Sequence, residues 1–552
     1  MEKTIKIFLK NDFNDTLELK YATYVKDLLK YVKEPEKYIV AKVNNEITSF
    51  SFSIKVNATV EFLTMQDNFG MEVYRRSLSF LLAKVSTKLF PQRRLIIGHS
   101  LGPGYYFEYE NHCVTKEEVR FLEEEMKKEV IENIPIRRER FSYTEALDYF
   151  KKTGKTDKYK LLFGLNMSKL SIYRCDDFFE LFDGPMVSQT GRLKYFSLIY
   201  YAPGFILQFP RRSNPEQVAQ FSEQHKIFKV YRESKDQGRI LNVDNVGGLN
   251  ELIINKQIDN FIQINEALQT RKIIKLADDI FKKKETCRLI TIAGPSSSGK
   301  TTFSKRLSIE LQALGLKPFT ISLDNYFVDR DKTPKDEEGN IDYEALDALN
   351  VDLFNEHLKK LLNNEKVNLP IYNFFTGKSS IKDEETSIKE DEIIVIEGIH
   401  CLNEKLTYLI KPENKFKIYI SALTQMNIDD NNRIPTTDNR IIRRMVRDYK
   451  YRGHSAKKTF QMWPLVRRGE EKYIFPFQND ADGYFNSALD YELAVLRPYA
   501  ESILRQIKPY EEEYAEASRL LRFLAYFLST PPKNVPPTSI LREFIGGSFF
   551  DY

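Results

Sequence analysis

Cysteine, tryptophan and long apolar runs are scarce in this sequence. Four of the 552 residues are cysteines (Cys113, Cys175, Cys287 and Cys401), there is one tryptophan, and no C-x-x-C pair occurs. This spacing argues against a disulfide framework and a cysteine zinc site. No apolar run approaches the roughly 20 residues that cross a bilayer, and the N-terminus lacks the pattern of a signal peptide. We therefore expect a cytoplasmic protein with no membrane partner.

A large excess of one charge is also missing. The chain has 83 Lys and Arg residues against 78 Asp and Glu residues, which gives a formal net charge of +5. A protein devoted to nucleic acid usually concentrates more positive charge than this, although local basic patches are compatible with it. The hydrophobic fraction of 42% and the length of the chain predict about three or four domains, each with a core of its own.

The most informative segment is a P-loop at residues 294–301, which fits the pattern G-x-x-x-x-G-K-[ST]. The apolar run at 288–293 predicts a buried strand before it, and 302–314 predicts a helix after it. Backbone N–H groups, the helix dipole and the charge of Lys300 together form an anion site. Thr301 would place its hydroxyl on Mg²⁺. We predict binding of a nucleoside triphosphate, a property that motors, GTPases, regulatory ATPases and small-molecule kinases share.

Two acidic residues follow predicted strands in the same half of the chain. The strand at 317–323 ends at Asp324, and the strand at 393–396 ends at Glu397. Ligands of open α/β sheets bind at the carboxyl ends of the strands. Asp324 could accept a proton from a substrate hydroxyl, or it could cap the next turn. Glu397 could face Mg²⁺, or it could be an exposed carboxylate at a strand end.

A run of arginines follows on a predicted helix at 438–452. Its members are Arg440, Arg443, Arg444, Arg447 and Arg452. Residues four apart share one helix face, so their charges repel each other until anions arrive. The run is compatible with a solvated basic face. It is also compatible with a lid that closes on phosphates, because the planar guanidinium pairs well with phosphate oxygens.

Residues 286 to about 510 resemble uridine kinase, within the uridine kinase and phosphoribulokinase group. The matching motifs are G-P-S-S-S-G-K-T-T at Gly294–Thr302, L-D-N-Y-F around Asp324, I-D-Y around Asp342, P-I-Y-N-F at Pro370–Phe374, E-G at Glu397–Gly398, and R-R-x-x-R-D at Arg443–Asp448. The resemblance implies a nucleoside kinase that transfers the γ-phosphate of ATP to the 5′-hydroxyl of a nucleoside, with ATP and Mg²⁺ as cofactors.

The resemblance also assigns roles to individual residues. Asp324 would be the base, acting with Lys300 and Arg447 as the catalytic group. ATP would be bound by Gly294, Pro295, Ser296, Ser297, Ser298, Gly299, Lys300, Thr301, Thr302 and Arg452. The nucleoside would be bound by Asp342, Tyr326, Tyr372, Phe374, Arg444 and His454. The metal would be held by Thr301, Glu397 and Asp324.

Two departures from the uridine kinase pattern lie on the side that recognises the base. The histidine expected shortly after Phe374 is replaced by Thr376-Gly377-Lys378, and the last lid arginine is replaced by His454. Uridine or cytidine is therefore the first expectation, with thymidine or a purine nucleoside open. Two other functions stay open: an RNA- or ribosome-associated regulatory NTPase, and a sugar-phosphate kinase of the phosphoribulokinase type.

Residues 1 to about 225 resemble the N-terminal region of threonyl-tRNA synthetase, a TGS domain followed by the tRNA-editing domain. The resemblance lies in segments 74–83, 97–98 with 104–107, and 177–186. Editing domains carry an H-x-x-x-H pair and a C-x-x-x-H pair, and these four places hold Arg76, Phe80, Phe182 and Met186 here. The resemblance thus implies the fold without the editing chemistry, because fold and function separate readily.

We predict an α/β chain in five parts. These are a β-grasp-like TGS module at 1–66, an α+β editing-like domain at 67–225, a helical connector at 226–285, a P-loop kinase domain with a helix-covered parallel sheet at 286–510, and a helical tail at 511–552. Within the first part, residues 4–9 alternate like a strand and 22–32 have helical spacing. Homo-oligomerisation and RNA binding by the N-terminal half are further expectations.

Overall fold

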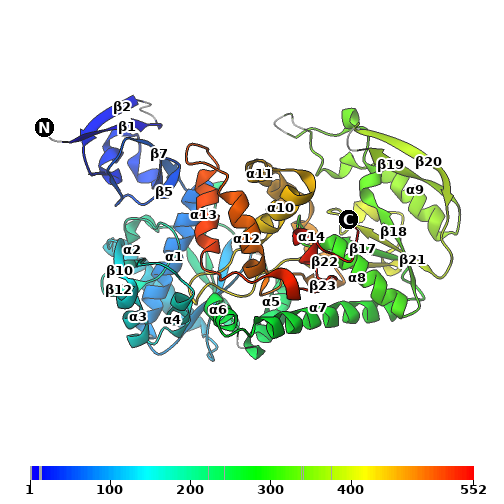
Figure 1. The fold of residues 1–552 in the computed structure, drawn as a ribbon, viewed down its shortest axis with the longest axis horizontal. Coiled ribbons are helices and arrows are strands. Elements are labelled where there is room, and N and C mark those ends of the chain that lie inside the picture. The colour runs from blue at the N-terminus through cyan, green and yellow to red at the C-terminus, as the bar shows by residue number, and fades with distance from the viewer. Residues whose placement is uncertain are drawn as a thin grey trace. The chain divides into compact units, whose positions relative to one another are not determined.

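The structure is a computed structural model that describes residues 3–11, 15–221, 223–241, 243–336, 339, 341–373 and 376–551. The chain forms two compact units, and each unit is assembled from three separate stretches (Figure 1). Unit 1 contains Met1–Lys256, Gln425–Pro435 and Leu504–Ser529, and unit 2 contains the remainder. The predicted connector is thus divided at Lys256 and the predicted tail at Ser529.

The first sheet of unit 1 has five strands in the order β2-β1-β7-β4-β5. Its central pair, β1 and β7, is parallel, and the other pairs are antiparallel. The predicted alternation is confirmed in β1, where Ile5, Ile7 and Leu9 are buried. The spacing at 22–32 produces a 3-10 helix at Val25–Tyr31, with Val25 and Leu28 in the core. The elements are β1 Thr4–Leu9, β2 Asp15–Lys20, β3 Thr23–Tyr24, β4 Tyr38–Val43, β5 Glu46–Thr48, β6 Ser53–Ile54 and β7 Ala58–Thr64.

The rest of unit 1 surrounds helix α1, Asn68–Leu89, which is buried along most of its length. A four-stranded sheet has the order β13-β14-β9-β8, and a three-stranded sheet has the order β10-β11-β12. The strands are β8 Leu95–Ser100, β9 Gly104–Tyr109, β10 Arg137–Ser142, β11 Lys169–Cys175, β12 Phe178–Glu180, β13 Ser197–Tyr201, β14 Gly204–Gln208, β15 Pro210–Arg211 and β16 Asn214–Val218. The helices are α2 Lys116–Glu132, α3 Tyr143–Lys152, α4 Thr156–Phe163, α5 His225–Ile240, α6 Val246–Ile254 and α13 Tyr514–Leu524.

Hydrogen bonds explain why unit 1 recruits distant parts of the chain. The side chain of Asn250, on α6, donates to the carbonyl of Tyr526 at 2.8 Å and accepts from the N–H of Leu528 at 2.8 Å. In the stretch 425–435, both oxygens of Asp430 accept from the guanidinium of Arg94, at 2.6 and 2.7 Å. These segments are therefore part of the unit that buries them.

The sheet of unit 2 has five strands in the order β18-β21-β17-β22-β23, and every neighbouring pair is parallel. The strands are β17 Leu289–Ala293, β18 Lys317–Ser322, β21 Glu392–Glu397, β22 Lys415–Ser421 and β23 Gly483–Asn486. Strands β17 and β21 are almost wholly buried, as expected for a parallel sheet with helices on its faces. This arrangement confirms the predicted α/β fold class.

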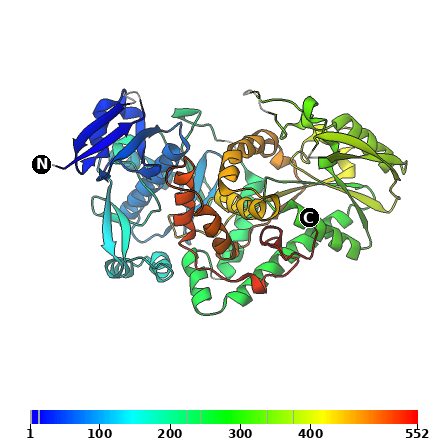
Figure 2. The ribbon, with the colours of Figure 1, turned by 45° about the horizontal axis from the view of Figure 1, so that its top comes forward.

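The helices of unit 2 include two that follow the predictions closely. Helix α8, Lys300–Ala313, begins directly after the P-loop, and α10, Thr436–Arg452, carries the arginine run. A hairpin of β19 and β20 lies beside α9 (Figures 1 and 2). The other elements are α7 Ile258–Phe281, α9 Val351–Leu362, β19 Val367–Asn373, β20 Lys378–Thr386, α11 Ala456–Tyr473, α12 Glu492–Leu504 and α14 Arg542–Ile545. In the described part of the chain, no helix is both long enough and apolar enough to span a bilayer.

Candidate nucleotide-binding site

Three neighbouring strands of unit 2 end at the same edge of the sheet and bring three predicted groups together. In the register of the sheet, Glu397 of β21 pairs with Ile292 of β17 on one side and with Ser322 of β18 on the other. The P-loop begins two residues after Ile292, and Asp324 follows two residues after Ser322. The anion-binding loop and both predicted acids therefore lie at one edge, where open α/β sheets bind ligands.

The backbone of the P-loop requires its two glycines. Gly299 has a φ of +80°, a conformation that side chains disfavour, and a Cβ at Gly294 would collide with the carbonyl oxygen of Ile420. The ammonium of Lys300 curls back and donates to the carbonyls of Gly294 at 2.9 Å and Pro295 at 3.2 Å. Burial lowers the pKa of Lys300, and nearby carboxylates partly offset that effect. The ammonium of Lys300 thus lies against the loop that would bind the phosphates.

Thr301 and Glu397 provide oxygen atoms of the kind that Mg²⁺ binds. The hydroxyl of Thr301 donates to Oε2 of Glu397 at 3.3 Å. Burial raises the pKa of Glu397 to about 7, and the charge of Lys300 acts in the opposite direction. Hard oxygen donors next to a phosphate site fit Mg²⁺ well, so these residues are suited to the metal that a P-loop kinase uses.

Asp324 lies in the short 3-10 helix that follows β18, and its side chain is open to solvent. The surrounding protein raises its pKa, whereas the positive charges of Lys300 and Arg452 lower it. The negative charge of Asp324 in turn raises the pKa of Glu397. Asp324 therefore belongs to the same electrostatic site as the P-loop lysine and remains accessible to an incoming substrate.

Two arginines of α10 hold the P-loop at Ser296. Arg444 donates to the hydroxyl of Ser296 at 2.7 Å, and Arg440 donates to its carbonyl at 3.0 Å. Glu470 of α11 accepts from the N–H of Ser296 at 3.1 Å and forms a buried ion pair with Arg440. The predicted substrate ligand Arg444 thus reaches the P-loop, whereas Arg440 serves the structure of the loop.

Arg443 has a structural role in unit 2. Its side chain is fully buried and donates to Glu492 of α12, to the carbonyl of Ser487 at 2.9 Å and to the carbonyl of Ser297 at 3.4 Å. The arginine run is therefore neither a uniform solvated face nor a uniform phosphate clamp. Arg440 and Arg443 are buried, whereas Arg447 is half-buried and Arg452 is exposed.

The carboxylate of Asp448 lies next to Arg447 and Arg452, the last two arginines of the run. Arg447 donates to Oδ1 of Asp448 at 2.8 Å, and Nε of Arg452 lies 3.7 Å from the same oxygen. Nδ1 of His454 lies 4.0 Å from Oδ2. Burial lowers the pKa of Arg452 and of His454. The structure thus brings the predicted residues Arg447, Arg452 and His454 together around one carboxylate.

Asp342, the predicted ribose ligand, lies in a polar cluster. One of its oxygens accepts from the N–H of Glu344 at 3.0 Å, and the other accepts from the hydroxyl of Tyr473 at 3.3 Å. Burial raises the pKa of Glu344, and Arg444 and Lys300 lower it. Glu344 is therefore close enough for the charges of Lys300 and Arg444 to act on its pKa. Through Glu344, the predicted ribose ligand Asp342 is near the P-loop.

Aromatic side chains lie next to this cluster. The ring of Tyr372 is 5.5 Å from that of Phe327, which is 6.3 Å from that of Tyr343. The predicted substrate ligand Tyr326 is placed differently: it is 2% exposed, packs on Phe354 in the core and pairs its hydroxyl with His357 at 3.1 Å. Phe374 lies outside the described residues.

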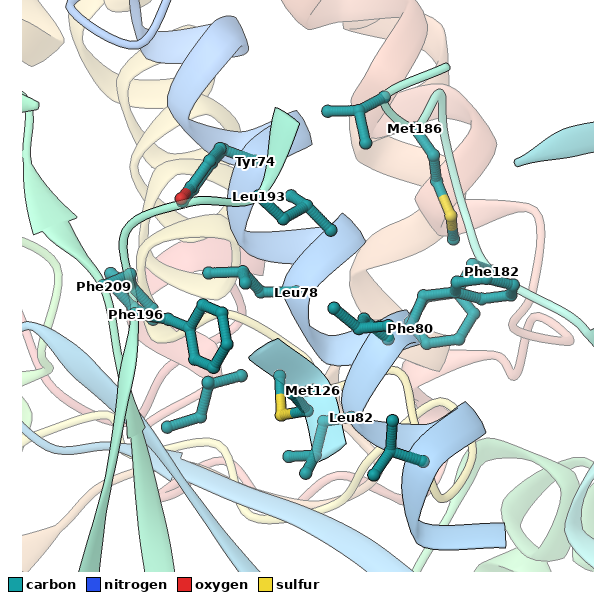
Figure 3. Close-up of a cluster of buried hydrophobic side chains, with 14 of the residues drawn as sticks. Tyr74, Leu78, Phe80, Leu82, Met126, Phe182, Met186, Leu193, Phe196 and Phe209 are labelled. Atoms are coloured by element: carbon teal, nitrogen blue, oxygen red, sulfur yellow. The ribbon is translucent and has the colours of Figure 1, made fainter. Parts of the chain in front are cut away.

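Three of the four editing-like positions of unit 1, Phe80, Phe182 and Met186, form part of a hydrophobic cluster (Figure 3). Phe80, Phe182 and Met186 are all less than 5% exposed, and Arg76 donates to the carbonyl of Pro185 at 2.9 Å. The three apolar side chains offer none of the nitrogen, oxygen or thiolate ligands of a zinc site, and the guanidinium of Arg76 is a cation that donates to a carbonyl.

Three side chains elsewhere in unit 1, Glu129, Cys175 and Asp176, are close enough together to be compared with a metal site. Among the described residues, one trio of potential ligands converges: Glu129, Cys175 and Asp176. The ammonium of Lys84 pairs with Glu129 and donates to Asp176 at 2.9 Å. Burial raises the pKa of the Cys175 thiol to about 12, which disfavours the thiolate that a metal needs. A lysine therefore supplies the positive charge at this place.

Several residues at the nucleotide site could not be singled out from the sequence. Glu470, Glu492, Glu344 and Glu543 reach the P-loop region from segments far along the chain, and no local pattern marks them. Phe327 is the exception, because it directly follows the L-D-N-Y segment. An aromatic residue three positions after Asp324, the acid at the end of a strand, could have marked it as a candidate site residue.

Residues 289–494 match the Phosphoribulokinase / Uridine kinase family. This stretch is a P-loop kinase domain. The match covers the sheet, the P-loop, Asp324, Glu397 and the arginine helix, and it confirms the predicted family. A P-loop kinase uses ATP and usually Mg²⁺, and Thr301 with Glu397 fits that requirement.

The N-terminal region of the chain is similar to threonine–tRNA ligases, which confirms the second resemblance. The ligase of Desulforamulus reducens is 34% identical over 205 residues, which are 36% of this chain and 32% of that enzyme. The ligase of Clostridioides difficile is 30% identical over 194 residues, which are 34% of this chain and 30% of that enzyme. The chain thus spans about a third of the length of these relatives.

Two solved kinase structures align with part of this chain at low identity and low TM-score. A possible uridine kinase from Bacillus stearothermophilus has 20% identity and a TM-score of 0.28, covering 39% of this chain and 98% of that one. The D-glycerate 3-kinase of Cryptococcus neoformans has 14% identity and a TM-score of 0.22, covering 46% of this chain and 87% of that one.

Proposed function

We propose that the chain is an ATP- and Mg²⁺-dependent nucleoside kinase that phosphorylates the 5′-hydroxyl of its substrate. The observation that carries the proposal is the sheet register around Glu397, because it brings the P-loop, Glu397 and Asp324 to one edge of the sheet. A regulatory NTPase needs the P-loop and the metal site, but it has no use for an accessible acid beside them.

The acceptor side supports a sugar substrate with an aromatic base. Asp342 and Tyr473 offer a carboxylate and a hydroxyl that suit the hydroxyl groups of a ribose. Tyr372, Phe327 and Tyr343 form an aromatic group next to them, and Tyr343 is 41% exposed. A flat base stacks on aromatic rings, whereas a small sugar phosphate gains little from them.

The proposed reaction assigns a task to each residue at the sheet edge. Asp324 accepts the proton of the 5′-hydroxyl as that oxygen attacks the γ-phosphorus, and the bond between the β–γ bridging oxygen and the γ-phosphorus breaks. Lys300 leaves the carbonyls of Gly294 and Pro295 to pair with the phosphate oxygens, and Arg447 stabilises the charge on the transferred group. Bound Mg²⁺, held by Thr301 and Glu397, would neutralise phosphate charge.

A coupled ADP-release assay tests this proposal. The full chain is supplied with ATP and Mg²⁺ and with a panel of ribonucleosides, deoxyribonucleosides and sugar phosphates. We expect a nucleoside to accelerate ADP release at least tenfold over the rate without acceptor. Hydrolysis that no acceptor accelerates, together with tight RNA binding, would support a regulatory NTPase instead, and the best rate with a sugar phosphate would support the phosphoribulokinase type.

The variant Asp324→Asn tests the role of the base. General-base catalysis contributes about 10²- to 10⁴-fold, so we expect kcat to fall by about that factor while the Kd of ATP changes less than about threefold. The matched control is Asp391→Asn, an exposed carboxylate before β21 that pairs with Lys317. Wild-type kcat in Asp324→Asn would remove Asp324 from the mechanism.

A further inference from the structure

A carboxylate from the C-terminal segment binds the helix that follows the P-loop. Glu543, in α14, accepts from the hydroxyl of Thr302 at 2.7 Å and from the backbone N–H of Thr302 at 3.3 Å. Thr302 is fully buried, and Glu543 is 7% exposed. No local sequence pattern predicts this contact, because 241 residues separate the two partners.

The donors that Glu543 uses belong to the predicted phosphate site. Thr302 is in the first turn of α8, where backbone N–H groups lack a partner four residues earlier and point toward the helix end. Such a helix end attracts anions through its N–H groups and its dipole, and in P-loops it receives nucleotide phosphates. A carboxylate oxygen, like a phosphate oxygen, carries negative charge and accepts hydrogen bonds from backbone N–H and hydroxyl groups.

The electrostatics of the site respond to Glu543. Burial lowers the pKa of Lys300, and the charges of Glu397 and Glu543 raise it in part. Burial likewise lowers the pKa of Arg452, and Glu543 is among the carboxylates that oppose this effect. Glu543 therefore supplies negative charge to the same cationic groups that the phosphates of a nucleotide would meet.

The segment that carries Glu543 is firmly packed. Ile540 covers Gly299, so that a Cβ at Gly299 would lie 2.5 Å from Cγ2 of Ile540. The guanidinium carbon of Arg443 lies 5.0 Å from the centre of the Phe544 ring. The ammonium of Lys450 donates to the carbonyl of Ile545 at 2.6 Å. The carboxylate is thus presented by a turn anchored in unit 2.

We propose that Glu543 is a built-in stand-in for a nucleotide phosphate, so that ATP or ADP binds fully only when its carboxylate leaves Thr302. The proposal rests on the proposed function for the identity of the anion, a phosphate of the bound nucleotide. It makes the C-terminal segment an autoinhibitory element of the kinase site. The apparent Kd for nucleotide equals the intrinsic Kd divided by the fraction of molecules in which the carboxylate has left Thr302. The smaller that fraction is, the weaker the apparent binding.

Nucleotide binding to full-length variants tests the proposal. The substitutions are Glu543→Ala and Glu543→Gln, and the matched control is Asp551→Asn, which removes the same charge from an exposed position of the same segment. Isothermal titration measures the Kd of ADP with Mg²⁺ and, separately, the Kd of adenosine, with no second ligand present. We expect Glu543→Ala to bind ADP at least tenfold more tightly, Glu543→Gln to shift in the same direction, and Asp551→Asn to match the wild type.

Adenosine separates competition with phosphate from a general opening of the site. Because adenosine has no phosphate, its Kd should be unchanged in both Glu543 variants. An ADP Kd that is unchanged or weaker in a folded Glu543→Ala variant overturns the inference and leaves the proposed function intact. Failure of the wild type and of every variant to bind ADP overturns both.

A second measurement keeps the inference testable if the variants fail to fold. A crystal structure of the wild-type chain with ADP and Mg²⁺ should show the Glu543 carboxylate out of hydrogen-bond range of Thr302 and a phosphate oxygen in its place. Retention of both hydrogen bonds from Thr302 to Glu543, with ADP in the P-loop, would overturn the inference directly.

Discussion

The ring of Phe80 lies 5.6 Å from the ring of Phe182, edge to face, at two places where the resemblance to an editing domain would put metal ligands. Met186 lies in the same cluster, which is part of the core around α1 (Figure 3). Apolar packing has taken the place of metal coordination there, so the contribution of these residues to the protein is stability.

The substitution Phe80→Ala should therefore destabilise unit 1 strongly. Removing a fully buried phenylalanine costs about 3–5 kcal/mol, from lost burial and from the cavity left behind. Urea unfolding followed by circular dichroism measures the change. The control is Phe121→Ala on α2, where the side chain is 51% exposed and less than about 1 kcal/mol is expected. Equal losses for the two variants would contradict the packing role of Phe80.

The buried pair of Arg443 and Glu492 gives a prediction for unit 2. Replacing Glu492 with Gln leaves the Arg443 guanidinium charged and uncompensated in the core, which costs about 3–5 kcal/mol. The double variant Arg443→Met with Glu492→Leu should recover much of that loss, because no buried charge remains. Unfolding midpoints in urea test both statements.

A surface pair provides the control for this prediction. Glu356 and Lys360 form an i,i+4 ion pair on α9 with side chains 57% and 43% exposed. The substitution Glu356→Gln should change the free energy of unfolding by less than about 0.5 kcal/mol, because exposed pairs contribute little. If Glu492→Gln were as mild as Glu356→Gln, Arg443 would not depend on Glu492 for its charge.

Local sequence patterns predicted well the edge of the sheet that carries the P-loop, Asp324 and Glu397. The strand runs before Gly294, Asp324 and Glu397 are confirmed as β17, β18 and β21, and their common direction follows from the alternation of strands with helices. Each of these predictions needed only a short apolar run and the residue at its end. For the same reason the start of α8 at Lys300 was predictable within two residues.

Contacts between distant segments were beyond such patterns. Tyr326 belongs to the L-D-N-Y motif, yet its ring packs in the core, because nothing in the motif tells which face of a short 3-10 helix turns inward. The arginine run was likewise ambiguous. Whether Arg443 meets solvent, phosphate or protein depends on Glu492, which lies 49 residues further along the chain.

Lys158 illustrates the same limit and yields a prediction for unit 1. Its ammonium is fully buried, donates to Asn431 at 2.8 Å and Asp157 at 3.1 Å, and lies 3.5 Å from Asp429. The surrounding carboxylates raise its pKa against the effect of burial, so it stays charged. Lys158 therefore binds the stretch 425–435 to the rest of unit 1 through Asn431 and Asp429.

The substitution Lys158→Met should destabilise unit 1 by about 3–5 kcal/mol at pH 8, because several carboxylates lose their buried partner. The loss should shrink toward pH 5, where the carboxylates can take up protons. Lys160→Met is a matched control two residues away, since Lys160 is half exposed and pairs with the exposed Glu251. Thermal unfolding at both pH values distinguishes the two sites, and a loss independent of pH would contradict the electrostatic account.

Glu397 makes the stability of the nucleotide-free protein depend on pH in a direction that can be worked out. Burial raises its pKa from the usual 4.5 to about 7, so between these values the folded state binds more protons than the unfolded state. The contribution of this residue to stability therefore falls as the pH rises from about 4.5 to 7. Glu397→Gln removes that dependence and should be more stable than the wild type at pH 8, with little difference at pH 4.

The same substitution should harm the proposed reaction, because Glu397→Gln removes a carboxylate from the predicted metal site. We therefore expect kinase activity to fall although the nucleotide-free protein becomes more stable. Differential scanning fluorimetry from pH 4 to 8, with ADP release assayed in parallel, measures both effects. Glu413→Gln, an exposed carboxylate elsewhere in unit 2, controls for the change in net charge. A Glu397→Gln protein less stable than the wild type at pH 8 would show that Glu397 serves the fold rather than the ligand.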